Sequence, residues 1–333
     1  MKLITNNTNS NGHVSNDTVN EFEQTILSDS IVQQVKSINP LRFKIRFLLY
    51  RFLRFFFSFS SRKICKKFID KPLKDNGHLL TIMMGLDVEK YRQYGLFTCH
   101  NRSIYLFDAW PHDYDKIVSF VETFKINFVF VSASQSAKVL NGILGNRTIV
   151  NWVPEGINPQ EYKFNSFENK NIDVLALGRK YDLYHEKILP YFENNAVTYL
   201  YEKVKGQLIF FSRQEFINGL ANAKISICVP SSITHPERSG NVETMTIRYL
   251  QSMASKCLVI GHAPKEMIEL FGYNPVIEID MDEPVEQIKT ILSKYSNYIE
   301  FVEKNYKTVC KHHTWLNRWT IIKNSLSKDK EML

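Results

Sequence analysis

The sequence predicts an α/β fold made of two domains with parallel sheets. Short apolar runs alternate with stretches of helical periodicity through most of the chain, which is typical of βαβ units. The run CLVIG at 257–261 is continuously apolar, as strands buried on both faces of a parallel sheet are. The 333 residues are enough for about two domains of common size.

The composition is that of a globular protein from a reducing compartment. Apolar residues make up 44% of the chain and charged residues 23%. The five cysteines are odd in number and lack C-x-x-C spacing, which disfavours a disulfide framework or a structural zinc site. The first 20 residues are rich in Asn, Ser and Thr and contain no apolar core of a signal peptide. We therefore expect a cytoplasmic protein.

The basic character of the chain is concentrated in one segment. The net charge is +8, yet residues 42–74 carry eleven Lys or Arg and one acid, Asp70. From Leu41 to Asp70 these cations interleave with Phe, Leu and Tyr, which favours a helix lying on an anionic membrane surface. A core helix with a basic outer face remains the alternative. Nucleic acid is not expected as a partner, because a phosphate groove does not require so many large aliphatic side chains.

The first part of the chain divides into three segments. Residues 1–20 are expected to be a disordered tail, and 21–75 a helical, basic-aromatic segment. Residues 76–153 are expected to form the first domain. Its predicted strands cover 79–84, 103–107 and 127–131. Its predicted helices cover 88–94 and 114–124.

Polar residues follow the second predicted strand of this domain. Asp108, His112 and Asp113 come directly after it, and the carboxyl ends of parallel strands face the ligand crevice. All three are acceptor-side candidates, and Asp108 is the best candidate for a general acid or base. Alternatively, Asp113 caps the following helix and His112 is exposed to solvent.

The second domain is expected at 172–310, after a linker at 154–171. A strand at 173–177 leads into Gly178-Arg179-Lys180, where a glycine admits a close backbone approach and two cations suit a phosphate. Ser212 and Glu215 have capping-box spacing and open a helix. Further strands are predicted at 197–201, 208–211, 225–229 and 275–279, and a final helix at 311–333.

The stretch from His235 to Gly261 predicts a ligand site within this domain. A polar loop precedes a helix at about 244–255, whose start is a natural anion site. Arg238 adds a guanidinium fork suited to phosphate or carboxylate. Glu243, just before the helix, is placed to accept hydrogen bonds from sugar hydroxyls.

These motifs resemble those of a known enzyme family. Glu243, followed eight positions later by Gln251, resembles the E-x7-E element of retaining GT-B glycosyltransferases, closest to family 4 and the CgeB-like group. NWVPEGI at 151–157 resembles the PxG turn that opens their interdomain linker, and Gly178-Arg179-Lys180 resembles their diphosphate clamp. The resemblance covers about 128–333. It departs at Gln251, an amide in place of the second acid, and at Lys256, where the family has glycine.

The resemblance implies a fold and a set of roles. The fold would be GT-B, two Rossmann-like domains with parallel sheets facing a cleft, and the last helix would return to the first domain. Glu243 would hold the donor sugar and Gln251 the ribose. The implied donor-binding residues are Gly178, Arg179, Lys180, Arg238, Ser239, Gly240, Glu243, Thr244 and Gln251.

The resemblance also implies an activity. A sugar would pass from a nucleotide-sugar donor to a glycan or lipid-linked acceptor in cell-surface polysaccharide synthesis, at the inner face of the cell membrane. Retention of configuration and independence of metal or other cofactors are expected. If the enzyme inverts instead, Asp108 is the expected general base. A GT-B nucleotide-sugar epimerase and a non-catalytic nucleotide-sugar or glycan binding protein remain open alternatives.

Overall fold

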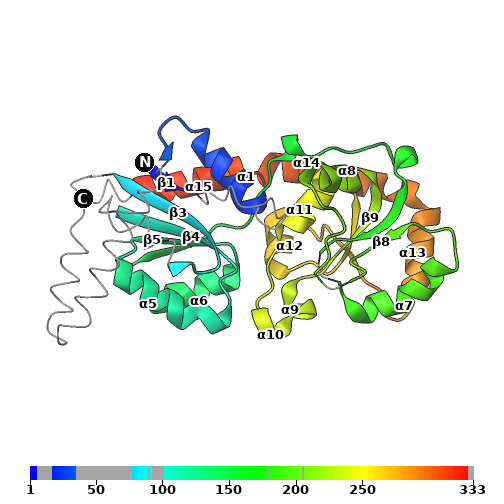
Figure 1. Ribbon diagram of the computed structural model, residues 1–333, viewed down its shortest axis with the longest axis horizontal. Helices are drawn as coiled ribbons and strands as arrows, with labels where there is room; N and C mark the ends of the chain where they lie inside the picture. The colour runs from blue at the N-terminus through cyan, green and yellow to red at the C-terminus, as the bar shows by residue number, and fades with distance from the viewer. Residues whose placement is uncertain are drawn as a thin grey trace.

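The computed structural model describes residues 1–5, 17–34, 77–88, 91, 101–178, 180–204 and 206–328. They form two α/β domains that lie side by side (Figure 1). The basic-aromatic segment at 41–70 and Arg179 lie outside the described residues, so the expectations for them stay predictions.

Each domain is built on a parallel sheet, which confirms the predicted fold class. Within the described residues, the first sheet has six strands in the order β2-β1-β3-β4-β5-β6, and the second has five in the order β11-β10-β9-β7-β8. Every pairing within these two sheets is parallel. The strands are β1 (Lys2–Ile4), β2 (Gln33–Gln34), β3 (His78–Met84), β4 (Asn101–Phe107), β5 (Phe128–Val131), β6 (Ile149–Trp152), β7 (Ile172–Ala176), β8 (Tyr199–Leu200), β9 (Ala223–Cys228), β10 (Leu258–Gly261) and β11 (Ile277–Glu278).

Helices cover both faces of each sheet. In the first domain, α1 and α15 share a buried core with one face, and α5 and α6 share another with the opposite face. In the second domain, α8, α11 and α12 pack on one side and α7 and α13 on the other. The α-helices are α1 (Asp17–Leu27), α5 (Tyr114–Phe124), α6 (Ser134–Leu144), α7 (Asp182–Glu193), α8 (Arg213–Asn222), α9 (Ser231–Thr234), α10 (Pro236–Ser239), α11 (Ile247–Ala254), α12 (Lys265–Phe271), α13 (Pro284–Ser293), α14 (Ile299–His312) and α15 (Trp315–Lys328). Short 3-10 turns occur at Pro111–Asp113, Pro159–Glu161, Phe167–Asn169 and Tyr295–Tyr298.

Residues 1–5 and 17–20 belong to the first domain, in contrast to the disordered tail expected over 1–20. Strand β1 pairs with both β2 and β3, and Leu3 is fully buried. Helix α1 begins at Asp17, and its Phe22 stacks on Trp315 of α15 with ring centroids 4.3 Å apart. A strand of three residues is too short to show the alternation that predicts a strand.

The run 208–211 is not a strand, in contrast to the prediction. Ile209 and Phe210 pack against the core of the second domain without pairing to the sheet. Ser212 then caps α8, because its hydroxyl oxygen accepts a hydrogen bond from the Glu215 backbone N–H at 3.2 Å. Apolar residues that bury their side chains beside a helix start resemble a short strand in the sequence.

The linker packs tightly against the segment that returns to the first domain. Ile157 forms an isolated parallel bridge with Thr314. A Cβ atom on Gly156 would lie 2.9 Å from the Thr314 carbonyl carbon and from the Trp315 backbone nitrogen, so this position requires glycine. The chain returns to the first domain at this contact. Helix α15 therefore follows the second domain in sequence but packs against the first.

The strand order of the second sheet defines where its ligand crevice lies. Taken in chain order, the five strands are arranged 5-4-3-1-2, which is the doubly wound pattern. The order reverses between the neighbouring strands β7 and β9. In open α/β sheets, ligands bind outside the carboxyl ends of the strands at such a switch point.

Candidate functional site

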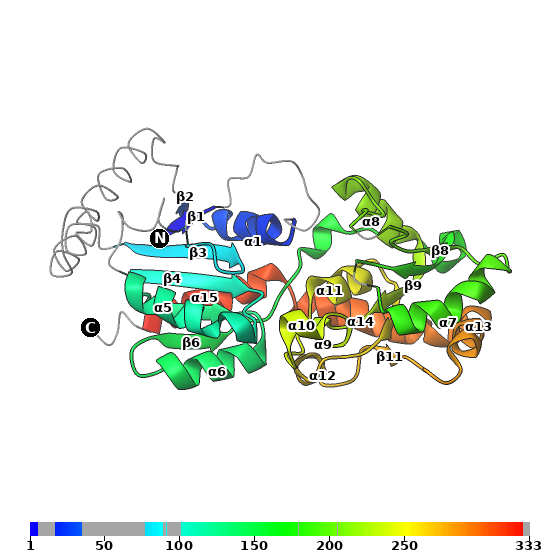
Figure 2. The ribbon, with the colours of Figure 1, turned by 60° about the horizontal axis from the view of Figure 1, so that its bottom comes forward.

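The carboxyl ends of the strands in both sheets meet at the domain boundary. Asp108 follows β4, and its Oδ2 accepts a 2.6 Å hydrogen bond from Arg238 of α10. Ser134 lies just beyond β5, and its backbone N–H donates to Glu266 of α12 at 2.8 Å. Figure 2 shows α10 and α12 beside α6 of the first domain. The fold therefore brings an acceptor-side candidate, Asp108, into contact with a donor-side candidate, Arg238.

Asp108 and Arg238 sit on a small apolar contact between the domains. Trp110, Ala133 and Val242 are all buried there, and the Arg238 guanidinium lies 5.9 Å from the centre of the Trp110 ring. Asp108 has a φ of 49°, in the left-handed region that costs most residues energy but that Asp tolerates. Such an outlier at the end of a strand marks a position of functional interest.

His112 and Asp113 do not join this pair. His112 Nε2 lies 3.0 Å from Asp113 Oδ2, and Lys116 Nζ lies 2.8 Å from Asp113 Oδ1. The His112 side chain is 53% exposed. Asp113 occupies the N-cap position of α5, although its side chain makes no capping hydrogen bond. Both residues thus form a surface ion-pair group beside the Asp108 site.

The start of α11 is not an open anion site, which corrects the expectation from the sequence. Three backbone N–H groups just before and at this start already donate to side chains of the chain itself. Two of those acceptors are carboxylates, so the favourable end of the helix dipole is already occupied. The contacts are Glu243 N to Gln135 Oε1 at 2.7 Å, Met245 N to Glu266 Oε1 at 2.7 Å and Ile247 N to Glu155 Oε2 at 2.6 Å.

Glu266 is a buried carboxylate that joins the two domains, and no sequence motif marks it. One oxygen accepts from the Thr244 hydroxyl at 2.9 Å and from Met245 N, and the other accepts from Ser134 N. Burial raises the pKa of this carboxyl, and the hydrogen bonds to its oxygens oppose that shift. Thr244, a predicted donor-binding residue, therefore presents its hydroxyl proton to Glu266.

Glu243 lies beside a histidine held by a second carboxylate. His262 follows β10, and its Nε2 lies 3.7 Å from Glu243 Oε1 while its Nδ1 lies 2.6 Å from Glu278 Oε1. Glu243 and His262 side chains are both about one-third exposed, 29% and 34%. The imidazole therefore lies between two carboxylates and is hydrogen-bonded to Glu278. A histidine after a strand carries no motif of its own, so the sequence did not single it out.

The predicted diphosphate clamp lies at the carboxyl end of β7. Gly178 has a φ of 73°, which favours glycine. Lys180 Nζ lies 3.6 Å from Asp182 Oδ1 and 5.9 Å from the centre of the Tyr201 ring. Arg179, between them, is outside the described residues.

Ser239 and Gly240 shape the end of α10. The buried Ser239 hydroxyl donates to the His235 carbonyl at 3.2 Å. Gly240 has a φ of 55°, and a Cβ atom there would lie 3.4 Å from Pro111 Cγ across the domain boundary. Both residues directly follow Arg238 in the sequence.

Arg248 of α11 is a further cation at this edge that the sequence did not single out. Its NH1 donates to the Leu177 carbonyl at 2.8 Å and its NH2 to the Val229 carbonyl at 3.3 Å. A Cβ atom on Gly178 would lie 3.4 Å from Arg248 Cδ and NH1, so the glycine leaves this guanidinium uncovered by a side chain.

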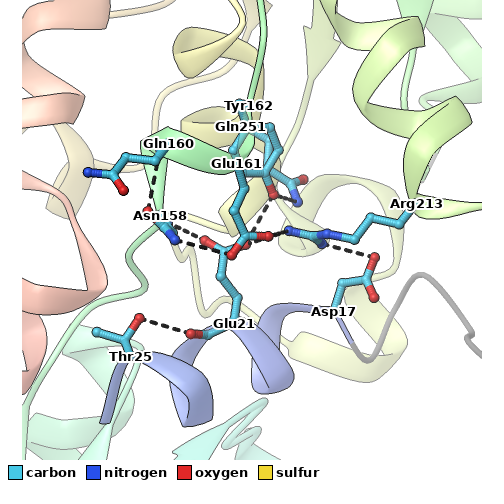
Figure 3. A network of polar contacts seen from close by, with 9 residues as sticks. All are labelled: Asp17, Glu21, Thr25, Asn158, Gln160, Glu161, Tyr162, Arg213 and Gln251. Atoms are coloured by element: carbon cyan, nitrogen blue, oxygen red, sulfur yellow. Dashed lines mark hydrogen bonds and ion pairs between the residues drawn. The ribbon is translucent and has the colours of Figure 1, made fainter. Parts of the chain in front are cut away.

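Gln251 belongs to a different, buried network (Figure 3). Its Nε2 donates to the Tyr162 hydroxyl at 3.0 Å, and that hydroxyl donates to Glu21 Oε2 at 3.2 Å. Arg213 donates to Glu21 at 3.2 Å and to Glu161 at 2.5 Å. Within the described part of the chain, no contact joins Gln251 to Arg238, Glu243 or Lys180.

Glu21 is the buried acid of this network. It links α1 to the linker by accepting a hydrogen bond from Asn158 N, and to α8 through Arg213. Burial raises its pKa to about 7, although the Asn158 hydrogen bond and Arg213 act in the opposite direction.

Lys256 adopts a backbone conformation that suits glycine. Its φ is 51°, so the residue type found here in the resembling family is the one this turn favours. The lysine side chain is held instead by Glu303, at 2.5 Å, and lies 4.0 Å from the centre of the Phe164 ring and 4.8 Å from that of Tyr306.

The described residues include no group of three His, Cys, Asp or Glu side chains placed to hold a metal ion. They also include no helix that is both long and apolar enough to cross a membrane.

The fold of this chain is similar to that of several solved structures. No protein-family model matches the chain, and no curated protein sequence matches it significantly. The solved structure of TarM is similar, with a TM-score of 0.52 and 13% identity over 79% of this chain and 57% of TarM. The chain thus spans somewhat more than half the length of TarM.

Other similar structures have TM-scores just below this. An α,α-trehalose-phosphate synthase (UDP-forming) from Burkholderia vietnamiensis gives 0.48 with 9% identity, over 76% of this chain and 75% of that one. Anabaena HepE in complex with UDP-glucose gives 0.47 with 10% identity, over 80% and 94%. Together with the two parallel sheets, the likeness to TarM confirms that this chain has the GT-B glycosyltransferase fold, two Rossmann-like domains joined by a short linker.

Proposed function

We propose that the protein is a glycosyltransferase that moves a sugar from a nucleotide-sugar donor to an acceptor. One observation carries the proposal: the carboxyl ends of both sheets meet where Asp108 bonds to Arg238. Ligands of open α/β sheets bind at such edges. A donor on the second domain and an acceptor on the first would then share one site.

The roles of the residues follow from their chemistry. Arg179 and Lys180 would neutralise charge that develops on the leaving diphosphate, which is electrostatic stabilisation of the transition state. Glu243, which lies beside His262, would accept hydrogen bonds from donor-sugar hydroxyls. We further propose retention of configuration with no metal requirement, and a glycan or lipid-linked acceptor used in polysaccharide synthesis. Asp108 would be the general base if the enzyme inverts.

The first experiment measures the melting temperature against UDP, GDP, CMP, ADP and dTDP. A nucleotide at ~100 times its dissociation constant should stabilise the protein by about 2.7 kcal/mol, which shifts the melting temperature measurably. The shift should shrink in Lys180→Ala and Glu243→Ala and persist in Lys138→Ala, a control on the exposed face of α6. No shift with any nucleotide would count against the proposal.

A second measurement separates the enzyme from the alternatives. The matching nucleotide-sugar should be hydrolysed slowly without acceptor, and Glu243→Ala should abolish this. Binding without any turnover would favour the binding-protein alternative. That alternative is supported by the position of Gln251, whose side chain is hydrogen-bonded within a buried network. Recovery of an isomeric nucleotide-sugar would favour an epimerase.

We also propose that residues 41–70 hold the protein on an anionic membrane surface. Deleting residues 1–75 cannot test this, because it would remove β1 and α1 from the first domain. Replacing Arg51, Arg54, Lys63 and Lys67 by Gln should reduce sedimentation with phosphatidylserine vesicles at an unchanged melting temperature. Equal sedimentation would refute the membrane role.

A further inference from the structure

We propose that Arg248 binds the diphosphate of the donor, as a substrate-binding residue that no sequence motif marks. This inference rests on the proposed function, because it assigns a ligand group within the same site. It is carried by the position of the guanidinium, by the absence of an acidic partner among the described residues and by Gly178, which places no side chain against the guanidinium.

Arg248 lies at the switch point of the second sheet. Leu177 follows β7 and Val229 follows β9, the two neighbouring strands between which the strand order reverses. The guanidinium donates to both of their carbonyls, at 2.8 and 3.3 Å, and so spans the carboxyl edge where ligands of doubly wound sheets bind. Each terminal nitrogen carries two protons and therefore keeps one N–H for another acceptor.

The charge of Arg248 is not balanced by an acid. Among the three described arginines of residues 172–310, Arg213 and Arg238 form ion pairs, whereas Arg248 has no carboxylate within ion-pair distance in the described part of the chain. Its known acceptors are neutral carbonyls, and the side chain is partly buried. A cation drawn partly out of water without a counter-charge is costly, so the site favours an anion.

A glycine beside the guanidinium and two unpaired hydroxyls close in sequence to Val229 and Arg248 accompany this cation. Gly178 presents no side chain over the guanidinium, and its φ of 73° disfavours replacement by another residue. The hydroxyls of Ser231 and Thr246 are buried and find no hydrogen-bond partner among the residues that the structure describes. Ser231 lies two positions beyond Val229, and Thr246 two positions before Arg248. A diphosphate supplies several acceptor oxygens for unpaired donors of this kind.

The test compares the affinities of a nucleoside, its monophosphate and its diphosphate by calorimetric titration, using the nucleotide that the melting panel identifies. Arg248→Gln should weaken the diphosphate at least about tenfold, as expected for loss of a charged hydrogen bond, and leave the nucleoside unchanged. Arg147→Gln, an arginine with 80% side-chain exposure on the first domain, is the matched control and should bind all three normally.

The variant Arg248→Lys distinguishes a structural role of Arg248 from a role in diphosphate binding. If Arg248 only ties two strand ends together, this variant should lower the melting temperature and weaken nucleoside and diphosphate equally. The proposal expects a selective loss of the diphosphate. Wild-type affinity for diphosphate in both variants would overturn the inference alone. Absence of diphosphate binding in the wild-type protein would overturn the proposed function together with it.

Discussion

Arg238 donates a 2.6 Å hydrogen bond to Asp108, and this ion pair joins the two Rossmann-like domains at the edge where their strands end. Both side chains remain partly exposed, at 48% and 23%. Asp108 is an acceptor-side candidate and Arg238 is a donor-binding candidate. The fold places the two side chains in direct contact.

Breaking this pair should affect catalysis far more than stability. Exposed ion pairs contribute roughly 0.2–1 kcal/mol, so Asp108→Asn should lower the free energy of unfolding by no more than about 1 kcal/mol. If Asp108 serves the acceptor as a general base, the transfer rate should fall by about 10²-fold or more. Rates and urea denaturation measure the two effects. Asp115→Asn, at an exposed position of α5 with no predicted role in the site, is the control and should change neither appreciably. A normal rate in Asp108→Asn would assign Asp108 to domain contact only.

Glu21 should make the stability of the protein depend on pH. Its pKa is about 7 in the folded protein, above the ordinary value of 4.5, so the folded state binds the proton more tightly than the unfolded state. The stability from this group is therefore fully present below about pH 4.5 and is lost as the pH rises through 7, by on the order of 3 kcal/mol. Glu21→Gln cannot titrate and should show a flatter profile of unfolding free energy against pH. Parallel profiles for this variant and the wild type would contradict the prediction, and Glu122→Gln, on the surface, should match the wild type.

Glu266 should be important for stability because it satisfies donors from both domains. Glu266→Ala leaves the backbone N–H groups of Ser134 and Met245 without their acceptor, at about 1–3 kcal/mol for each group that stays buried. We expect a loss of about 3 kcal/mol in urea denaturation. Glu269→Ala, on the exposed side of the same helix, should stay within about 0.5 kcal/mol of the wild type. Similar losses in the two variants would show that Glu266 has no special role.

Placing an acid at position 251 should destabilise this protein. Gln251 donates to Tyr162, which an ionised carboxylate cannot do, and Asp17, Glu21 and Glu161 already surround the single Arg213. Gln251→Glu should therefore lower the free energy of unfolding by about 1–3 kcal/mol at pH 8, and by less at pH 5. The isosteric change Gln214→Glu, on the exposed side of α8, is the control. A gain in nucleotide affinity without loss of stability would instead support a ribose contact at this position.

The sequence located the elements that rest on local patterns. Parallel strands were predicted from apolar runs, and α8 from its cap at Ser212, because these signals lie within a few residues of one another. Asp108 and Gly178 were found for the same reason, since each directly follows a recognisable strand. In contrast, β1 was missed, since three apolar residues acquire their meaning only by pairing with β3, far along the chain.

The sequence alone predicted the GT-B fold through its resemblance to that family, together with several parallel strands and the polar residues at their ends. Which of those residues meet is visible in the folded structure alone. It paired Asp108 with Arg238, filled the start of α11 with Glu155 and Glu266, and moved Gln251 into the Glu21 network. It also left Arg248 without an acid at the switch point. Hydrogen bonds and ion pairs depend on distances between atoms, and residues far apart in sequence acquire those distances only when the two domains pack.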